Sequence, residues 1–389
     1  MTRPFYLLLV LVSLAAGCGG HGPQVTHVAS AAAPPPLATV TPRHASSPAP
    51  IPTRTPEPVP TSSAPCTCLA HDPDSTATLR TAFAHRTPEW AGGDVLDAVA
   101  LPDGRRLWIF GDTFYGTVSP EGALGPDTVM VHSSAVIQDG GCFDPIVPPG
   151  GRSWAPGGSS STWLWPQNAA VAGDELVVFT TEIESRGNGV PGLNFNVVGG
   201  VALIYRLDDL TAPAATITDV PAIDQHPFGW GIEAVDHERY LYAHVEGEGT
   251  YAARAPEDAL LEFERWTYWD GHHWVPDVDH AVPIHPLRLR VNTAPDGSLQ
   301  TAAIPFGERH VVLYDMASPV GPVTERRQVD LDPIWPTHVD GWAYQPLLLS
   351  FADDTDQLLV NFLPWDVDLL WSDVHLYGPR VLPAPAPAN

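Results

Sequence analysis

From residue 90 onward the sequence alternates short, largely apolar runs with turn-forming residues. The first pair of runs, Val95–Leu101 and Arg105–Gly111, flanks the tripeptide Pro102-Asp103-Gly104. An apolar run, an Asp-Gly turn and a second apolar run predict a β-hairpin. Neither run alternates cleanly between polar and apolar residues, so we expect both faces of this hairpin to be buried.

Similar pairs of runs recur along the chain. Four further hairpins are predicted: Asn168–Ala172 with Glu175–Thr181, Gly231–Asp236 with Tyr240–Val245, Leu299–Ile304 with Arg309–Asp315, and Tyr344–Phe351 with Gln357–Phe362. Outer strands are predicted at Val201–Leu207, Arg265–Trp269 and Arg326–Leu331, and the only helix-like segment is Glu257–Phe263. Five β-units of about 60 residues are typical of a five-bladed β-propeller, although periodicity alone also fits a large β-sandwich.

The N-terminal residues have a different character. Met1–Cys18 contains one basic residue and an apolar run from Phe5 to Ala16, which predicts a secretory signal. Its end, Ala15-Ala16-Gly17-Cys18, resembles a lipobox, in which Cys18 would carry the lipid; ordinary cleavage without a lipid is the alternative. No other apolar run approaches the ~20 residues that span a bilayer. We therefore expect an extracytoplasmic protein, held to the membrane through a lipid anchor only.

Residues 19–65 are rich in Pro, Ala, Ser and Thr and show no hydrophobic periodicity. Such a segment buries too little apolar surface to fold, so we expect a disordered, extended linker. Residues 66–389 then form the folded domain, with 44 acidic and 16 basic residues. This negative charge argues against nucleic acid and against anionic substrates. We expect a monomer.

Three cysteines remain beyond the lipobox: Cys66, Cys68 and Cys142. Secreted proteins favour disulfides. Cys66 and Cys68 are too close in sequence to bridge each other easily, so we expect one of them to pair with Cys142. These spacings do not match a zinc site, and we expect neither a metal nor another cofactor.

Asp94 and Asp112 bound the first hairpin almost symmetrically about Asp103. Residues opposite each other in an antiparallel pair have Cβ atoms about 4.5–5.5 Å apart, so the two carboxylates are expected to meet. Such a pair titrates jointly, and mutual repulsion keeps one carboxyl protonated near neutral pH. A glycosidase needs this combination of proton donor and base or nucleophile. The alternative is that each Asp only caps a turn.

The pattern around this pair, W-x-G-G-D followed by L-P-D-G-R-x-L-W-x-F-G-D-T-F-x-G within Trp90–Gly116, resembles a family of secreted bacterial five-bladed β-propellers. A second match lies in Tyr240–Trp274, and a weaker third one runs from Tyr344 to Arg380. The family was long classed as a domain of unknown function and resembles arabinan-active glycosidases; some relatives are endo-acting D-arabinan hydrolases. The resemblance implies a propeller fold and a furanose-containing polysaccharide as substrate.

In a propeller the innermost hairpins point the same way, so other blades should present residues beside the acid pair. Carboxylates, amides and aromatic rings at one end are what a sugar site uses. The expected residues are Gln167, Glu182, Trp230, Glu246, Asp315, Gln345 and Asn361, with Trp165 also within reach. Glu182 is the expected catalytic substitute if Asp94 or Asp112 is structural, and the others are expected to bind substrate.

Two hypotheses follow from these observations. The first is a glycoside hydrolase that acts on a neutral, arabinan-like polysaccharide through the Asp94 and Asp112 pair. The second is a non-catalytic propeller that binds carbohydrate or another protein at the cell surface. The intact G-G-D and G-D-T-F motifs favour the enzyme, and the degenerate third match favours the binding protein.

Overall fold

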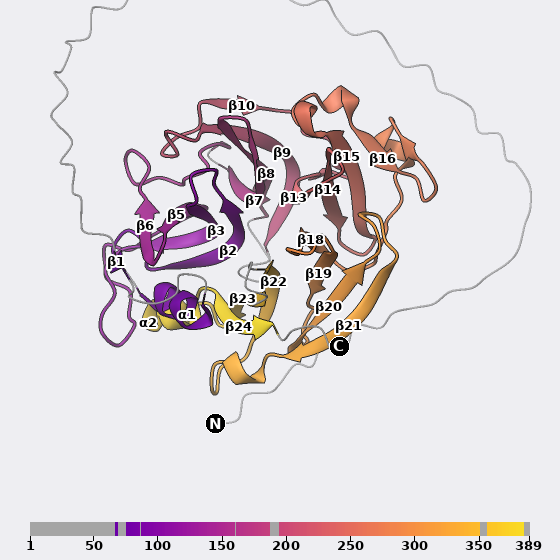
Figure 1. Ribbon diagram of the computed structural model, residues 1–389. Coiled ribbons are helices and arrows are strands. Elements are labelled where there is room, and N and C mark those ends of the chain that lie inside the picture. Colours follow the sequence, from indigo (N-terminus) through magenta and orange to yellow (C-terminus); the bar gives the residue numbers. More distant parts are fainter. Residues whose placement is uncertain are drawn as a thin grey trace, which may run out of the picture. The chain divides into compact units, whose positions relative to one another are not determined.

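The computed structural model describes residues 67–68, 75–85, 87–159, 161–186, 194–350 and 356–384. The predicted signal at 1–18, the linker at 19–65 and the lipid-bearing Cys18 lie outside the described residues. Five antiparallel sheets follow one another around a ring, as the colours of Figure 1 show. The protein is a five-bladed β-propeller, as the sequence repeats and the family resemblance together predicted. Within the described ranges no helix is long and apolar enough to cross a membrane.

The first blade is the largest sheet, with strand order β1-β6-β5-β3-β2 and β4 paired to β3. The strands of blade 1 are β1 (Thr67–Cys68), β2 (Gly92–Ala100), β3 (Arg106–Tyr115), β4 (Val129–Val131), β5 (Ser134–Asp139) and β6 (Cys142–Ile146). The turn between β2 and β3 is the predicted one. Gly104 there has φ +90°, a conformation that favours glycine, and Asp103 Oδ1 accepts a hydrogen bond of 3.1 Å from the Arg105 amide.

Blades 2 to 5 follow in chain order. Blade 2 contains β7 (Thr162–Ala172), β8 (Glu175–Ser185), β9 (Phe195–Arg206) and β10 (Ala215–Ile217), and a ribbon of β11 (Ala222–Ile223) and β12 (His226–Pro227) follows it. Blade 3 contains β13 (Trp230–Val235), β14 (Glu238–Val245), β15 (Gly249–Pro256), β16 (Thr267–Trp269) and β17 (Trp274–Val275). Blade 4 contains β18 (Arg290–Thr293), β19 (Leu299–Ala303), β20 (His310–Met316) and β21 (Val323–Asp330). Blade 5 contains β22 (Gly341–Ser350), β23 (Asp356–Pro364) and β24 (Arg380–Ala384).

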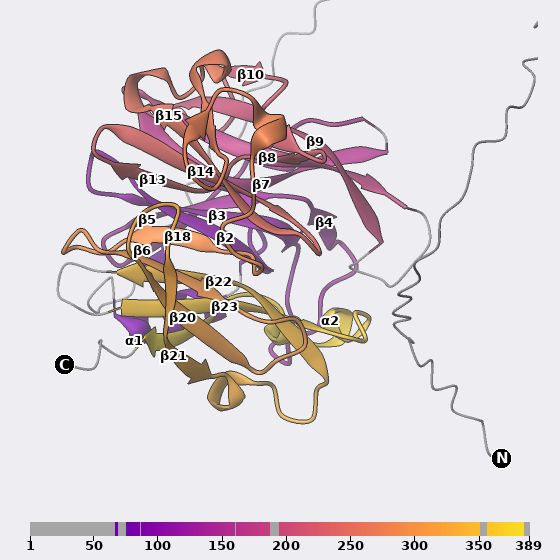
Figure 2. The same cartoon turned by 90° about the vertical axis from the view of Figure 1, so that its right-hand side faces the viewer.

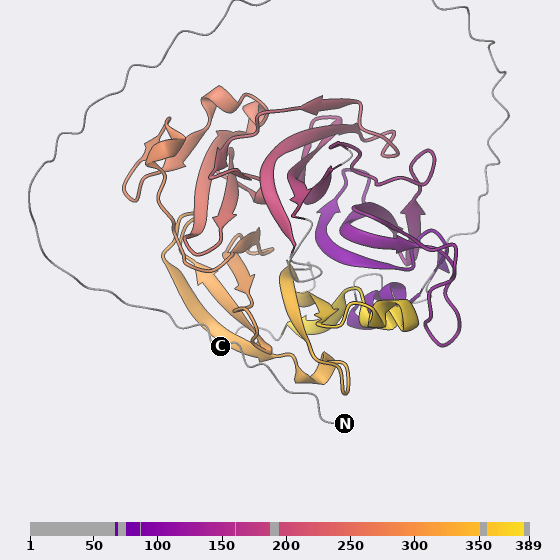
Figure 3. The same cartoon turned by 180° about the vertical axis from the view of Figure 1, so that it is seen from behind.

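The first strands of the blades form the inner wall of the ring. β2 contacts β7, β7 contacts β13, β13 contacts β18, β18 contacts β22, and β22 returns to β2. Figure 3 shows the closure, with the yellow fifth blade lying between the orange fourth blade and the indigo first blade. We call the end at which these five strands begin the site face, because β2 brings Asp94 to it. In the side view of Figure 2, α2 and β4 lie at this end.

One prediction about blade 4 was wrong. Its innermost hairpin is β18–β19, whereas the sequence pattern had assigned Leu299–Ile304 with Arg309–Asp315. The short inner strand reads Arg-Val-Asn-Thr and lacks the apolar run that marks the other hairpins. The strands that were predicted as an inner hairpin are therefore the second and third of the blade.

The helices are short. The helices are α1 (Thr76–Ala84), α2 (Leu369–Ser372) and the 3₁₀ turns η1 (Glu257–Ala259), η2 (Phe263–Arg265), η3 (Val278–His280), η4 (Asp332–Ile334) and η5 (Val374–Leu376). The predicted helical segment Glu257–Phe263 is thus two separate turns. Helix α1 was not predicted from the sequence. Ser75 caps this helix by accepting a 3.1 Å hydrogen bond from the Thr78 amide.

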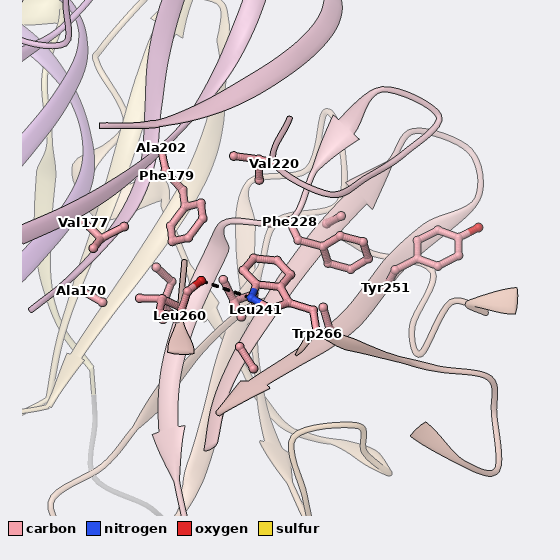
Figure 4. Packing of buried hydrophobic residues seen from close by; sticks show 14 of the residues in the cluster. Ala170, Val177, Phe179, Ala202, Val220, Phe228, Leu241, Tyr251, Leu260 and Trp266 are labelled. Carbon is pink, nitrogen blue, oxygen red and sulfur yellow. Dashed lines mark hydrogen bonds between the residues drawn. The ribbon is translucent and has the colours of Figure 1, made fainter. Parts of the chain in front are cut away.

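Apolar clusters fill the spaces between successive blades. The cluster between blades 2 and 3 is shown in Figure 4, where Phe179, Phe228 and Trp266 pack together. Trp266 is fully buried, and its indole nitrogen donates a 3.1 Å hydrogen bond to the Leu260 carbonyl. Leu79 and Phe83 of α1 join the cluster between blades 1 and 5. Because each blade buries its faces against its neighbours, hydrophobic packing fixes the ring.

Polar side chains tie the inner strands to one another. Asp97 on β2 lies 2.6 Å from the Arg290 guanidinium of β18 and accepts a 2.8 Å hydrogen bond from the Ala169 amide of β7. Asn361 on β23 accepts a 2.9 Å hydrogen bond from the Val95 amide and donates a 2.8 Å one to the Val95 carbonyl. These contacts fix the beginning of β2, and with it Asp94, relative to blades 2, 4 and 5.

Candidate active site

Asp94 and Asp112 lie together at the open end of the hairpin β2–β3. The register pairs Gly93 with Thr113 and Val95 with Phe110, and an irregularity between these pairs accommodates both aspartates. A Cβ at Gly111 would lie 3.3 Å from Leu96 Cδ1 and 3.7 Å from the Asp94 Cβ. The absence of a side chain at Gly111 therefore lets β3 approach β2 closely beside Asp94.

Asp94 is half-buried and hydrogen-bonded. Tyr344, near the beginning of β22 in blade 5, donates its hydroxyl hydrogen to Asp94 Oδ1. Burial raises the pKa of Asp94 to about 7; the bonds to Tyr344 and Tyr377 oppose this rise, and the charge of Asp112 adds to it. Repulsion between the two carboxylates was the predicted cause of the raised pKa. It contributes, but burial of Asp94 is the larger cause.

Asp112 has a different environment. Its Oδ1 accepts a 2.8 Å hydrogen bond from the Trp165 indole of β7 and lies 2.9 Å from His132 Nδ1. Its backbone carbonyl accepts a 2.8 Å hydrogen bond from the Tyr377 hydroxyl. The Asp112 side chain is 24% exposed. The two carboxyls therefore have different surroundings: burial favours the proton on Asp94, whereas Asp112 is partly exposed and contacts Trp165 and His132.

Aromatic rings extend from Asp112 across blade 2. Trp163 stacks on His132 with ring centroids 4.5 Å apart and an interplanar angle of 18°. Trp165 makes edge contacts with Trp163 at 5.8 Å and with Phe195 at 4.7 Å. Flat aromatic faces beside hydrogen-bonding groups are suited to sugar rings, whose faces are apolar and whose edges carry hydroxyls.

Among the predicted substrate-binding residues, Trp165 contacts the acid pair directly. Gln167 lies two residues further along β7 and donates to Thr181 Oγ1. Trp230 is 7% exposed, with the Arg288 and Arg290 guanidinium carbons 5.2 Å and 5.9 Å from its ring centroid. Gln345 has a left-handed φ of +48° and accepts a 3.5 Å hydrogen bond from Asn361.

The remaining predicted residues have other surroundings. Glu182 accepts a 2.9 Å hydrogen bond from Thr162. The side chain of Glu246 is 88% exposed, and its nearest partner is His244 at 3.6 Å. Asp315 lies on the third strand of blade 4, 3.4 Å from Arg326, so the prediction that it shares the site was wrong. Asn361 is completely buried and binds the Val95 backbone, so its predicted contact with substrate was also wrong.

Sequence reasoning missed His132, Tyr344 and Tyr377. Tyr344 is adjacent to Gln345, which was predicted instead, and the strand register is irregular between Tyr344 and Leu347. Tyr377 follows η5, whose Val374 and Leu376 pack on Phe114 and Ala91 of blade 1. In the part of the chain that the structure describes, no cluster of three or more His, Cys, Asp or Glu side chains is placed to hold a metal ion.

The fold and this arrangement define a five-bladed β-propeller with paired carboxylates at the beginning of its innermost hairpin. The chain belongs to the family described as "Domain of unknown function (DUF5005)", whose sequence profile matches residues 79–361. No similar sequence was found among curated proteins.

Solved structures share the fold. A candidate hydrolase from Bacteroides ovatus superposes with a TM-score of 0.63 at 17% identity, over 79% of this chain and 88% of that chain. The α-L-arabinofuranosidase PaAbf62A from Podospora anserina, in complex with cellotriose, has a TM-score of 0.44 at 8% identity, over 77% and 93%. The endo-arabinase from Bacteroides thetaiotaomicron has a TM-score of 0.40 at 11% identity, over 75% and 94%. At these identities the likeness concerns the fold alone.

Proposed function

We propose that this protein is an extracytoplasmic glycoside hydrolase that cleaves a neutral, furanose-containing polysaccharide, with an arabinan-like polymer as its substrate. The observation that carries the proposal is the meeting of Asp94 and Asp112 at one hairpin end, in two unlike environments. The motifs at Trp90–Gly116, which resemble those of arabinan-active glycosidases, supply the substrate class. The negative charge of the domain favours a neutral polymer over an anionic one.

The two carboxyls have different roles in this proposal. Asp94 retains its proton up to about pH 7 and donates it to the oxygen of the leaving sugar. Asp112 acts as the base or the nucleophile, held in place by the 2.8 Å hydrogen bond from the Trp165 indole and by His132 Nδ1 at 2.9 Å. Trp165 is also exposed enough to contact a sugar ring, so it both orients Asp112 and binds substrate.

The proposal is tested with Asp94→Asn and Asp112→Asn, which keep the side-chain shape and remove its titration. Each variant should release reducing ends from arabinan at least ~10²-fold more slowly than wild type, with a nearly unchanged melting temperature. Glu233→Gln is the matched control, because Glu233 also has a pKa raised by burial to about 7 but bonds Thr293. It should retain full activity.

The non-catalytic alternative predicts a different result. If the wild type binds a glycan but releases no reducing ends from any neutral polysaccharide tested, the protein is a carbohydrate-binding propeller. If both Asp variants unfold while Glu233→Gln does not, the two aspartates belong to the scaffold and the proposed acid pair is wrong.

A further inference from the structure

A line of aromatic side chains leads away from Asp94, on the opposite flank from Trp165. Trp342 lies 6.2 Å from Tyr344 between ring centroids, Trp365 lies 4.5 Å from Trp342, and Phe306 lies 6.3 Å from Trp365. We call Trp342, Trp365 and Phe306 the aromatic track. Since Tyr344 bonds Asp94, the track is continuous with the acid pair.

The strand directions place the whole track on the site face. Trp342 and Tyr344 lie near the beginning of β22, which is the site-face end of blade 5. Trp365 follows directly after β23, which returns antiparallel to β22, and its amide donates a 3.0 Å hydrogen bond to the Asp340 carbonyl. Phe306 lies in the turn after β19, which runs antiparallel to β18 in blade 4. The track therefore crosses from blade 5 to blade 4 on the face that holds the carboxyls.

The outer part of the track is exposed. Phe306 is 72% exposed and Trp365 is 44% exposed, whereas Trp342 is 6% exposed and supports Trp365 from below. Single apolar side chains scattered over a protein surface are ordinary, whereas a contiguous exposed group is unusual. The contact between the exposed rings of Trp365 and Phe306 therefore indicates a binding surface.

Polar groups lie beside the track. The Asp340 carbonyl accepts from the Trp365 amide, and the Asp340 side chain lies 4.0 Å from that of Arg309. The Arg309 guanidinium carbon lies 4.3 Å from the ring centroid of Trp335, which is not part of the track. The side chains of Arg309 and Asp340 are 50% and 94% exposed. Flat apolar faces bordered by a guanidinium and a carboxylate offer stacking to sugar rings and hydrogen bonds to their hydroxyls. A neutral sugar chain uses both kinds of contact, whereas an apolar protein partner would cover the charges of Arg309, Asp332 and Asp340 without offering them hydrogen bonds.

We propose that the aromatic track is a distal binding site for further sugar units of the polysaccharide whose cleavage Asp94 and Asp112 carry out, with Trp365 and Phe306 as stacking platforms. This inference rests on the proposed function, because the occupant is the same polymer. Trp165 and Phe195 on blade 2 would hold the chain on one side of the acid pair, and the track would hold it on the other.

Measuring polysaccharide binding and polysaccharide cleavage separately distinguishes a failure of this inference from a failure of the proposed function. In an Asp112→Asn background, which binds without cleaving, Trp365→Ala and Phe306→Ala should each weaken binding of linear arabinan about 10-fold, measured by affinity electrophoresis. Binding of arabinose, a single unit that cannot bridge the 6.2 Å and 4.5 Å ring separations between Tyr344 and Trp365, should change less than about twofold. In the otherwise native enzyme the same substitutions should raise KM for the polymer and leave kcat nearly unchanged, because they act away from the reacting bond.

Trp371→Ala is the matched control. Trp371 is 49% exposed and packs on Phe114 instead of on a ring of the track, so its loss should leave arabinan binding unchanged. If wild type cleaves arabinan and the track variants bind and cleave it equally well, the distal site is wrong and the proposed function stands. If neither the wild type nor the Asp112→Asn protein binds or cleaves a neutral polysaccharide, both proposals fail. Weakening by Trp371→Ala to the same extent would also overturn the track as a specific site.

Discussion

Tyr344 donates a hydrogen bond to Asp94 across 250 residues of sequence, from the innermost strand of the last blade to that of the first. The bond joins a carboxyl whose pKa burial raises to about 7 to a phenol whose own pKa burial raises well above its usual value. Tyr344 therefore stays protonated over the working range of pH, and it remains a donor whether or not Asp94 is ionised.

This relationship predicts the pH dependence of cleavage. Asp94 must carry a proton to act as the acid, so kcat/KM should fall about tenfold per pH unit above pH 7, as the carboxyl ionises. The Tyr344 bond lowers the pKa of Asp94, so Tyr344→Phe should move this decline to higher pH. The measurement is initial rates on arabinan from pH 5 to 9.

Two controls accompany that profile. Glu233→Gln removes another carboxyl of similar pKa and should leave the profile unchanged. Tyr115→Phe removes a buried tyrosine hydroxyl on β3 and should also leave it unchanged. A decline in Tyr344→Phe at the wild-type pH, or at lower pH, would show that Asp94 is not the group that titrates.

The buried pair of Asp97 and Arg290 should dominate the stability of the inner ring. Removing one partner from a buried ion pair leaves an uncompensated charge and typically costs about 3–5 kcal/mol. Arg290→Met should lower the free energy of unfolding by that amount in urea titrations. Adding Asp97→Asn should recover most of the loss, because the amide oxygen can still accept from the Ala169 amide. Equal instability of the single and double variants would contradict this account.

The exposed pair of Arg206 and Asp208 is the comparison for that measurement. Its atoms lie 2.9 Å apart with the side chains 57% and 68% exposed, so water screens the interaction. Arg206→Met should leave the urea midpoint unchanged within error.

The register of β1 against β6 sharpens the disulfide prediction. Cys68 lies directly opposite Cys142, so we expect the bond between these two and a free Cys66. Peptide mapping without reductant should recover the Cys68–Cys142 pair from wild type and from Cys66→Ser, but not from Cys68→Ser. The bond closes a loop of about 75 residues, and its loss should cost about 2–4 kcal/mol. A Cys66–Cys142 peptide would contradict the register argument.

We also propose that Cys18 is lipidated, as the apolar run ending in Ala-Ala-Gly-Cys indicates. Radioactive fatty acid should label the wild-type protein in cells and should not label Cys18→Ser. Equal labelling of both proteins would show that the lipid, if present, is attached elsewhere.

The sequence predicted the hairpins that read as paired apolar runs, and it placed Asp94 and Asp112 at the end of the first. It misplaced blade 4 because the inner strand of that blade is polar: Arg290 there is needed for Asp97, and Asn292 follows it. It missed α1 because the apolar face of that helix consists chiefly of Leu79 and Phe83. An inner strand that makes polar contacts across the ring loses the apolar pattern by which strands are recognised.

The site residues were harder to predict than the blades. The acid pair is local, since one hairpin brings both carboxyls together. Tyr344 and Tyr377 reach it from the last blade, which packs on the first, and the register of β22 is irregular next to Tyr344. Spacing within one sequence contains no information on contacts of that kind.

The way the ring closes affects when this protein can act. Asn361 of the last blade hydrogen-bonds both the amide and the carbonyl of Val95, the residue that follows Asp94. The contact that joins the last blade to the first therefore also positions Asp94, the proposed acid. Until blade 5 docks, Asp94 lacks its tyrosine donors and the surroundings that raise its pKa. If the chain is exported as proposed, N-terminus first, both aspartates emerge well before the blade that completes the proposed site. The proposed activity would then begin only when the last blade has been synthesised, exported and folded.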